Sequence, residues 1–245
     1  MRNPEARRHE RGAALMVLLS IILMAGASMA IEALLVKSKR LRDDQKATIA
    51  LAEAKRALIA TGALEAVTRT GFGNLPCPFA GTLADYATNA VAAGACGGND
   101  GVVAVGFLPW RSLGIAPLVD GDNAPLWYAV AGRFKTGSTQ TMPYTCDTAN
   151  LTINGSGNFA AILFSPGTPL ALLPSATMQS RIATSTAAGL RDQFLEQENA
   201  TATTNFRAMR IMTTTAGGVA SPPFNDRLLG ITCAEMIGAV NQMPL

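Results

Sequence analysis

The chain has 245 residues, of which 49% are hydrophobic and 15% are charged. This length can bury a sizeable core, and a charged fraction well below the roughly 25% of soluble domains excludes general disorder. The formal net charge of +3 is too near balance to indicate nucleic-acid binding. The single histidine, His9, precedes the first apolar run, so removal of that segment would exclude histidine-based triads and metal sites.

The N-terminus joins a basic segment to a long apolar run. Residues 1–12 carry four arginines against two glutamates, and Ala13–Ile31 contains 19 residues without a charge. About 20 such residues are needed to span a bilayer. We therefore expect the run to form a membrane-spanning helix.

Three interpretations of this run remain open on the residues alone. It can be an ordinary signal anchor that stays attached to the chain. It can be a cleavable export signal, because the small residues of Ala25-Gly26-Ala27 and Ser28-Met29-Ala30 have the spacing of a cleavage site. It can also be cut before the apolar residues, after Gly12, and be retained as a helix.

The helix predicted for this run continues well beyond it. No proline occurs between Pro4 and Pro76, and Ile31–Ala60 is rich in the strong helix formers Ala, Leu, Lys, Arg and Glu. One apolar stripe recurs at helical spacing and is formed by Ala47, Leu51, Ala54 and Leu58. We expect one continuous helix over Ala13–Thr61, whose second half packs this stripe on a folded domain.

The residues around Gly12 form a motif, in which Glu10-Arg11-Gly12 is followed by AALMVLLSIILMAGASMAIEALL. This motif resembles the class III leader and first helix of type IV pilins and type II secretion pseudopilins. The resemblance implies that a prepilin peptidase cuts after Gly12 and that Ala13 becomes the first mature residue. It also implies that the helix packs in the core of a filament.

Two residues depart from the pattern of that family. Ala13 stands where the first mature residue is usually Phe, and Val17 stands where the family has glutamate at mature position five. That glutamate is thought to pair with the N-terminal amine of a neighbour, and the pseudopilin assigned to the filament tip also lacks it. Val17 therefore favours a minor subunit over an abundant major pilin.

Beyond Gly71 the chain consists of short apolar runs separated by Gly, Pro, Asn and Asp, a pattern typical of strands and turns. Four runs are predicted to be strands: Val102–Phe107, Leu126–Arg133, Phe159–Phe164 and Leu228–Thr232. A short helix is expected over Gly189–Asn199. Thr232 and Glu235 have the spacing of a capping box that opens a final helix.

These elements predict an α+β fold, in which a long N-terminal membrane-spanning helix packs on a head with a mostly antiparallel sheet, as in pilins. The expected organisation is a leader over 1–12, the helix over 13–61 and the head over 62–245. Several head motifs also resemble a pilin-like bacterial group: Leu75-Pro76-Cys77-Pro78, Gly106–Trp110, Leu126–Val130, Phe194–Asn199 and Phe224–Leu229. These motifs imply a location and a fold more than a reaction.

The four cysteines all follow the predicted membrane helix. No pair has the C-x-x-C spacing and no histidine lies near them, so a zinc site is not expected. An even number fits two disulfides in an oxidising compartment, with three possible pairings. We favour Cys77 with Cys96 and Cys146 with Cys233, because the first pair closes a local loop after the helix. The alternative is four buried free thiols.

The segment Asp120-Gly121-Asp122-Asn123 is the candidate for a metal site. Asp120 and Asp122 alternate with a turn residue, and some pseudopilins bind calcium. The segment lacks the distal glutamate of an EF-hand loop, and we favour a plain β-turn. No G-x-S-x-G, P-loop or G-x-G-x-x-G motif occurs, so we expect no catalytic residue and no cofactor. Trp127 and Tyr128 are expected to be core aromatics.

The leading hypothesis is a non-enzymatic, pilin-like minor pseudopilin, a structural subunit of a type IV pilus or type II secretion apparatus. Its expected partners are other pilins through the N-terminal helix, the prepilin peptidase and the bacterial inner membrane, and not nucleic acid. The expected location is the inner membrane, as a single-pass protein with a cytoplasmic N-terminus and a head in the periplasm or in a surface filament. The alternative is a Sec-exported or singly anchored periplasmic binding protein or enzyme.

Overall fold

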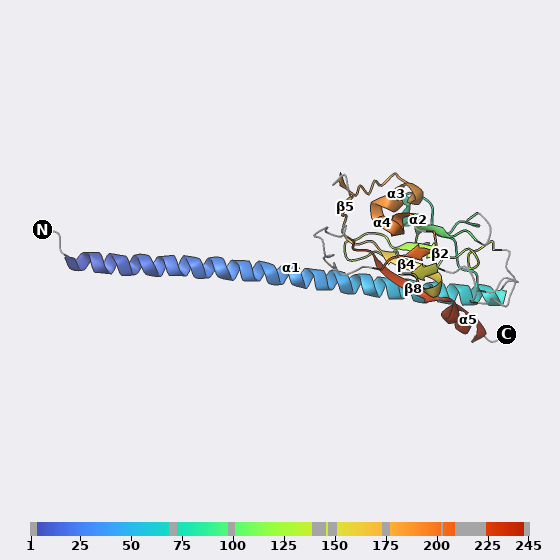
Figure 1. Cartoon of the computed structure of the whole chain (residues 1–245), viewed down its shortest axis with the longest axis horizontal. Helices are drawn as coiled ribbons and strands as arrows, with labels where there is room; N and C mark the ends of the chain where they lie inside the picture. Colours follow the sequence, from blue (N-terminus) through green and yellow to red (C-terminus); the bar gives the residue numbers. More distant parts are fainter. Residues whose placement is uncertain are drawn as a thin grey trace. The chain divides into compact units, whose positions relative to one another are not determined.

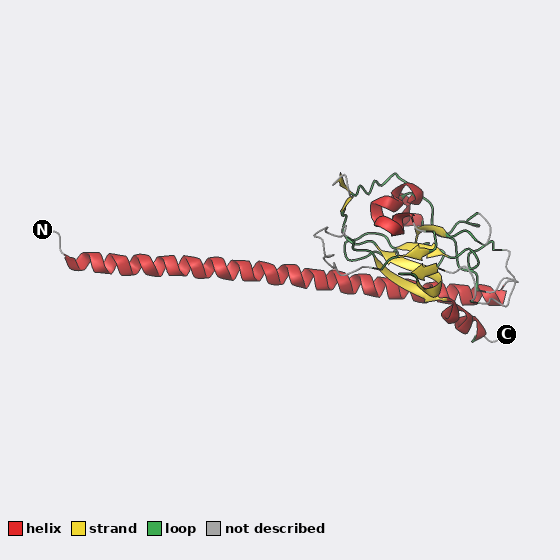
Figure 2. Cartoon of the chain, in the orientation of Figure 1, coloured by secondary structure: helices red, strands yellow, loops and turns green. Residues whose placement is uncertain are grey.

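The computed structural model describes residues 4–68, 73–97, 101–138, 146, 151–172, 177–201, 203–208 and 224–242, and for part of the first helix it describes the backbone only. Figures 1 and 2 trace the elements formed by these residues. In chain order they are α1 (Pro4–Thr68), α2 (Leu83–Asn89), β1 (Ala104–Phe107), β2 (Trp127–Val130), β3 (Leu151–Ile153), β4 (Ser156–Ser165), β5 (Ala171–Leu172), β6 (Thr177–Met178), α3 (Ala187–Phe194), α4 (Gln197–Thr201), β7 (Asn205–Phe206), β8 (Arg227–Thr232) and α5 (Cys233–Asn241).

The chain divides into two compact units, Met1–Gln45 and Lys46–Leu245, and the boundary lies within α1. α1 includes the whole of the helix predicted over Ala13–Thr61. The part of α1 after Lys46 carries the predicted apolar stripe and belongs to the same unit as the sheet. The boundaries expected from the sequence, after residue 12 and after residue 61, do not coincide with this division. They stay predictions.

The prediction of a membrane-spanning helix is wrong. Within the described part of the chain, no helix is both long and apolar enough to cross a bilayer. Within Ala13–Ile31, the described side chains are those of Met16 and of residues 18–24.

This finding overturns two expectations together. The predicted fold class placed an α+β head on a membrane-spanning helix, and the predicted location was that of a single-pass inner-membrane protein with a periplasmic head. Both depended on counting the apolar residues of the N-terminal run as one bilayer span. The described part of α1 does not provide such a span.

The second unit is built around one main sheet. Its strand order is β1-β2-β4-β3-β7, with β8 paired to β4. Among the described strands of this sheet, every pairing is antiparallel except that of β3 with β7. β5 and β6 form a separate pair. The four strands predicted from the sequence are confirmed as β1, β2, β4 and β8.

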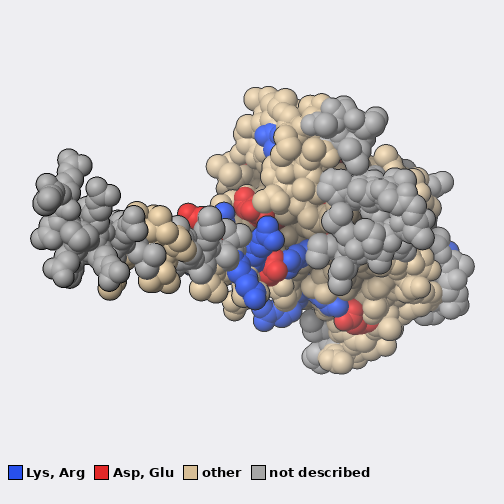
Figure 3. All heavy atoms as spheres, turned by 60° about the vertical axis from the view of Figure 1, so that its left-hand side comes forward, with Lys and Arg blue, Asp and Glu red and all other residues tan. Residues whose placement is uncertain are grey.

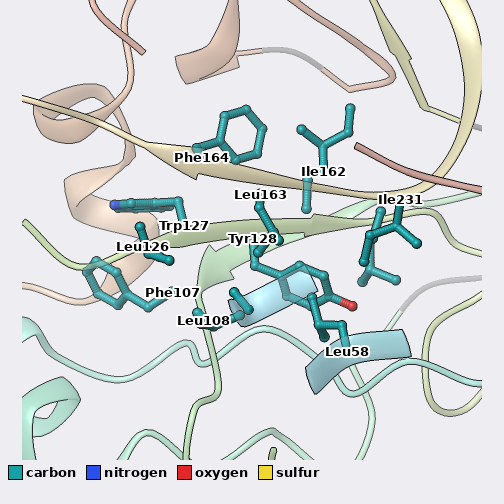
Figure 4. Packing of buried hydrophobic residues seen from close by; sticks show 14 of the residues in the cluster. Leu58, Phe107, Leu108, Leu126, Trp127, Tyr128, Ile162, Leu163, Phe164 and Ile231 are labelled. Carbon is teal, nitrogen blue, oxygen red and sulfur yellow. The ribbon is translucent and has the colours of Figure 1, made fainter. Parts of the chain in front are cut away.

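The strand β2 is buried on both faces, which explains its continuous apolar sequence. On one face, Tyr128 lies next to Leu58 of α1 (Figure 4). On the other face, the ring of Trp127 lies 4.6 Å from the ring centroid of Phe107 and 5.6 Å from that of Phe194 in α3. The sheet is therefore covered by α1 on one side and by α3 on the other (Figure 1).

The apolar stripe of α1 lies in the core of the second unit. All four of its members are at most 5% exposed: Ala47, Leu51, Ala54 and Leu58. A polar contact on the same helix fixes its position along the sheet, because Lys55 Nζ donates to the carbonyl oxygen of Gly230 at 2.9 Å. The same nitrogen pairs with Glu235 Oε1 at 2.7 Å. Glu235 also completes the predicted capping box with Thr232, which is confirmed at the start of α5.

The hydroxyl of Tyr128 is buried and has no hydrogen-bond partner among the described residues. Burial raises the pKa of this hydroxyl well above its ordinary value, so it stays neutral. A buried hydroxyl without a partner costs about 1–3 kcal/mol. We expect Tyr128→Phe to raise the free energy of unfolding by about 1 kcal/mol in urea titrations.

Tyr86 provides the matched control for this prediction. It is also buried, but its hydroxyl donates to the carbonyl oxygen of Leu118 at 2.8 Å. Tyr86→Phe removes that bond and should lower the free energy of unfolding by about 1 kcal/mol. Equal losses in the two variants would show that the hydroxyl of Tyr128 is satisfied.

Candidate functional site

The predicted processing and assembly residues lie within α1. The structure places Gly12, Ala13 and Val17 in the helix, and it describes none of their side chains. Cleavage after Gly12 and the role of Val17 in assembly therefore stay predictions.

The described side chains in the first unit expose many large apolar groups. Each is more than half exposed, and together we call them the α1 apolar surface: Met16, Leu18, Leu19, Ile21, Ile22, Leu23, Met24, Leu34, Leu35 and Leu41. Consecutive helical residues are about 100° apart, so the four residues Ile21–Met24 alone reach around the helix. A helix that is apolar all round is normally enclosed by other protein or an apolar medium.

Charged side chains follow the α1 apolar surface along the helix. Lys37, Lys39, Arg40 and Arg42 are all exposed. In the view of Figure 3, Lys and Arg side chains are interspersed with Asp and Glu side chains. The sequence thus changes within a few residues from an apolar helix to a basic one.

Two disulfides are present, with the pairing favoured from the sequence. Cys77 is bonded to Cys96, so a bridge spans the segment that contains α2. Cys146 is bonded to Cys233, the first residue of α5. The second bridge therefore ties the segment before β3 to the C-terminal helix.

The carboxylate of Asp120 is fully occupied by hydrogen bonds. Asp120 Oδ1 accepts from the backbone N–H groups of Asp122 and Ala124, each at 2.9 Å. Asp120 Oδ2 accepts from Ser165 Oγ at 3.3 Å and from the backbone N–H of Gly167 at 2.8 Å. These four donors use the lone pairs that a calcium ion would need.

The geometry around Asp120 instead fits a turn. Asn123 has a φ of 61°, the left-handed conformation that asparagine tolerates in turns. Its side-chain Oδ1 accepts from Lys46 Nζ of α1 at 2.8 Å. Within the described ranges, no group of three or more His, Cys, Asp or Glu side chains is placed to hold a metal ion. Asp120 and Asp122 therefore fit the β-turn that the sequence favoured.

A buried polar cluster that the sequence did not reveal lies between α3, α4 and β8. We call it the carboxyl cluster, and its members are Arg181, Glu196, Asn199, Asn225 and Asp226. Glu196 is 4% exposed, and Asn199 and Asp226 are 0% exposed. Buried carboxyl groups are uncommon and need partners, so the cluster requires a physical explanation.

Reciprocal hydrogen bonds hold the two carboxyl groups together. Glu196 Oε2 accepts from the backbone N–H groups of Asn225 and Asp226, each at 3.0 Å. Asp226 Oδ2 accepts from the backbone N–H of Glu196 at 3.0 Å and from Asn199 Nδ2 at 2.8 Å. Each carboxyl group thus caps the backbone of the segment that carries the other.

Burial raises the pKa of both carboxyl groups. For Asp226 the negative charge of Glu196 raises the pKa further, whereas the hydrogen bond from Asn199 lowers it by a smaller amount. For Glu196 the backbone donors and the positive charge of Arg181 offset part of the effect of burial. The two groups therefore bind protons more tightly than ordinary carboxylates.

The chain matches no protein-family model, no curated protein and no solved structure. The described residues define its class by geometry alone: a mixed helix-and-sheet protein with two disulfides, one long helix with an exposed apolar surface, and a buried carboxyl cluster.

Proposed function

We propose that this chain is a non-catalytic, pilin-like minor subunit of a type IV pilus or type II secretion apparatus, and that it assembles with other subunits through α1. The observation that carries the proposal is the α1 apolar surface, because its ten large apolar side chains are each more than half exposed. Apolar patches of this extent mark sites of association rather than free surface.

The arrangement of α1 supports the same role. In its second part the apolar stripe is buried, and Lys55 pairs with Glu235. Its first part presents apolar groups such as Leu18 and Leu23, which are 61% and 65% exposed. A helix that is anchored at one end and exposed at the other can be enclosed by the equivalent helices of neighbouring subunits.

The resemblance at Gly12 supplies the processing step. A prepilin peptidase would cut after Gly12 and leave Ala13 as the first residue of the mature subunit. Val17 cannot pair with the amine of a neighbour, which favours a subunit of low copy number. The disulfides Cys77–Cys96 and Cys146–Cys233 fit an oxidising compartment.

Photocrosslinking in the host organism tests the assembly. A photoreactive residue at Leu23, which is 65% exposed in α1, should crosslink to the helices of other pilin-like subunits. The matched control is Val91 in the head, which is 44% exposed and should give no such product. Absence of any Leu23 product would contradict assembly through α1, and abundant self-crosslinks would contradict the minor-subunit role.

Mass spectrometry of the same material distinguishes the rival function. The mature chain should begin at Ala13, and Gly12→Ala should leave a longer precursor. A mature N-terminus at Ser28 or Ile31 would instead indicate an exported binding protein or enzyme. That cleavage would remove the apolar residues from Met16 to Met24, and with them most of the α1 apolar surface.

A further inference from the structure

Glu196 and Asp226 come from segments 30 residues apart, and each carboxyl group accepts from the backbone of the segment that carries the other. Glu196 lies between α3 and α4, and Asp226 directly precedes β8. Their reciprocal backbone hydrogen bonds occupy Glu196 Oε2 and Asp226 Oδ2. The other two oxygens, Glu196 Oε1 and Asp226 Oδ1, are buried and receive no donor from the residues that the structure describes.

Two ionised carboxylates cannot share this position without a large cost. Each would bury an oxygen without a hydrogen bond, and the two like charges would repel each other in a medium of low dielectric. A single proton removes both difficulties, because an O–H group of one carboxyl can donate to the ionised oxygen of the other. Such charge-assisted bonds are roughly twice as strong as neutral ones.

The surrounding charges fit a pair that carries one negative charge. Arg181 donates from Nη1 to the carbonyl oxygen of Gly167 at 2.9 Å and stacks on the ring of Phe194 at 4.3 Å. Its positive charge acts on Asp120 and Asp122 as well as on Glu196 and Asp226, so it cannot neutralise all of them.

A second arginine near the cluster donates to the backbone. Arg191 of α3 donates from Nη2 to the carbonyl oxygen of Asn199 at 3.0 Å. This bond holds the backbone of α4. Asn199 in turn donates to Asp226 Oδ2 and to the carbonyl oxygen of Arg207, so its amide is also in use.

We propose that Glu196 and Asp226 share one proton in the folded protein and act as a clamp that joins the α3–α4 segment to the start of β8. The clamp is strongest in acid and weakens as the pair loses its proton. Glu196 Oε1 and Asp226 Oδ1 are the two oxygens left to share the proton, because backbone and amide donors occupy the other two. The proposal does not depend on the assembly of the chain.

The direction of the pH dependence follows from proton linkage. Unfolded Asp and Glu release their protons near pH 4, whereas the raised pKa of the buried pair keeps one proton bound at higher pH. The stabilisation is therefore complete below about pH 4 and is lost as the pH rises through the pKa of the folded pair. Over that interval the unfolding equilibrium constant should rise by up to about tenfold per pH unit for one proton.

The substitution Asp226→Asn tests this assignment in the full chain. Its amide oxygen can still accept from Glu196 N and Asn199 Nδ2, and its N–H₂ group provides a donor that does not titrate. In urea titrations from pH 5 to pH 9, the wild-type unfolding constant should rise with pH much more steeply than that of the variant. The unfolding constants of the wild type and of Asp226→Asn should differ most near pH 9.

The control is Asp192→Asn, which removes an exposed carboxylate from the same helix region. Its pH profile should run parallel to that of the wild type. Glu196→Gln is the second variant, and it should flatten the profile as Asp226→Asn does, because it also replaces one member of the pair by an amide.

Infrared spectroscopy of the folded chains gives a readout that is independent of the urea titrations. A carbonyl band of a protonated carboxylic acid should persist at pH 7 and should be absent in Asp226→Asn and in Glu196→Gln. The proposal is overturned if the wild type shows no such band at pH 7. Parallel pH profiles for the wild type, Asp226→Asn and Glu196→Gln would also overturn it.

Discussion

Replacing Cys146 and Cys233 by alanine should lower the free energy of unfolding by about 4–5 kcal/mol. The bridge closes 87 residues, and in the chain-entropy model a longer loop restricts the unfolded chain more strongly. The bridge also joins Cys146, before β3, to the first residue of α5, the helix whose Glu235 pairs with Lys55. Urea unfolding of the oxidised wild type and of the double variant measures the loss.

The second disulfide provides an internal comparison. Cys77 and Cys96 are 19 residues apart, so their replacement by alanine should cost about 3 kcal/mol. The free energy of unfolding should therefore fall less when Cys77 and Cys96 are replaced than when Cys146 and Cys233 are replaced, because the two expected losses differ only in loop length. A larger loss on removing the shorter bridge would show that native contacts around α2, rather than the unfolded chain, determine the effect.

The predictable part of the fold comes from patterns that are local in sequence. β2 and β8 are short apolar runs bounded by turn residues, and the capping box at Thr232 needs only the glutamate three positions later. The strand predicted over Leu126–Arg133 is longer than the observed β2. β2 ends at Val130 because a turn follows, in which Phe134 N donates to the carbonyl oxygen of Ala131.

Tertiary contacts explain where the local patterns mislead. One helix was predicted over Gly189–Asn199, but α3 ends at Phe194 and α4 begins at Gln197. Leu195 is extended between them, and Glu196 uses both its backbone and its side chain to bind the segment before β8. Nothing in the sequence near Glu196 identifies a partner 30 residues away.

The candidate sites divide in the same way. The cysteine pairing could be anticipated because few pairings are possible and one pair is close in the chain. The turn at Asp120 could be anticipated from its Asp, Gly and Asn residues. The carboxyl cluster could not be anticipated, because Glu196 and Asp226 lie in motifs that stood out only through resemblance to a pilin-like group, and the resemblance did not pair them. The predicted membrane span rested on composition, and the described part of α1 contradicts it.

Replacing Leu58 by alanine should lower the free energy of unfolding by about 2–5 kcal/mol, the range for a fully buried leucine. Leu58 is 0% exposed and lies against the face of the sheet that carries Tyr128 and Ile231 (Figure 4). The loss combines the removed apolar contact with the cavity left between α1 and the sheet. Denaturant unfolding followed by circular dichroism measures it.

The control is Leu64→Ala, at a position of the same helix whose side chain is 59% exposed. Leucine and alanine are both strong helix formers, so that change should alter stability by less than about 0.5 kcal/mol. Comparing the two variants separates burial from helix propensity. Similar small losses at both positions would mean that the second part of α1 is not held by its apolar stripe. In that case the polar contacts of Lys55 with Gly230 and Glu235 would have to hold the helix on the sheet.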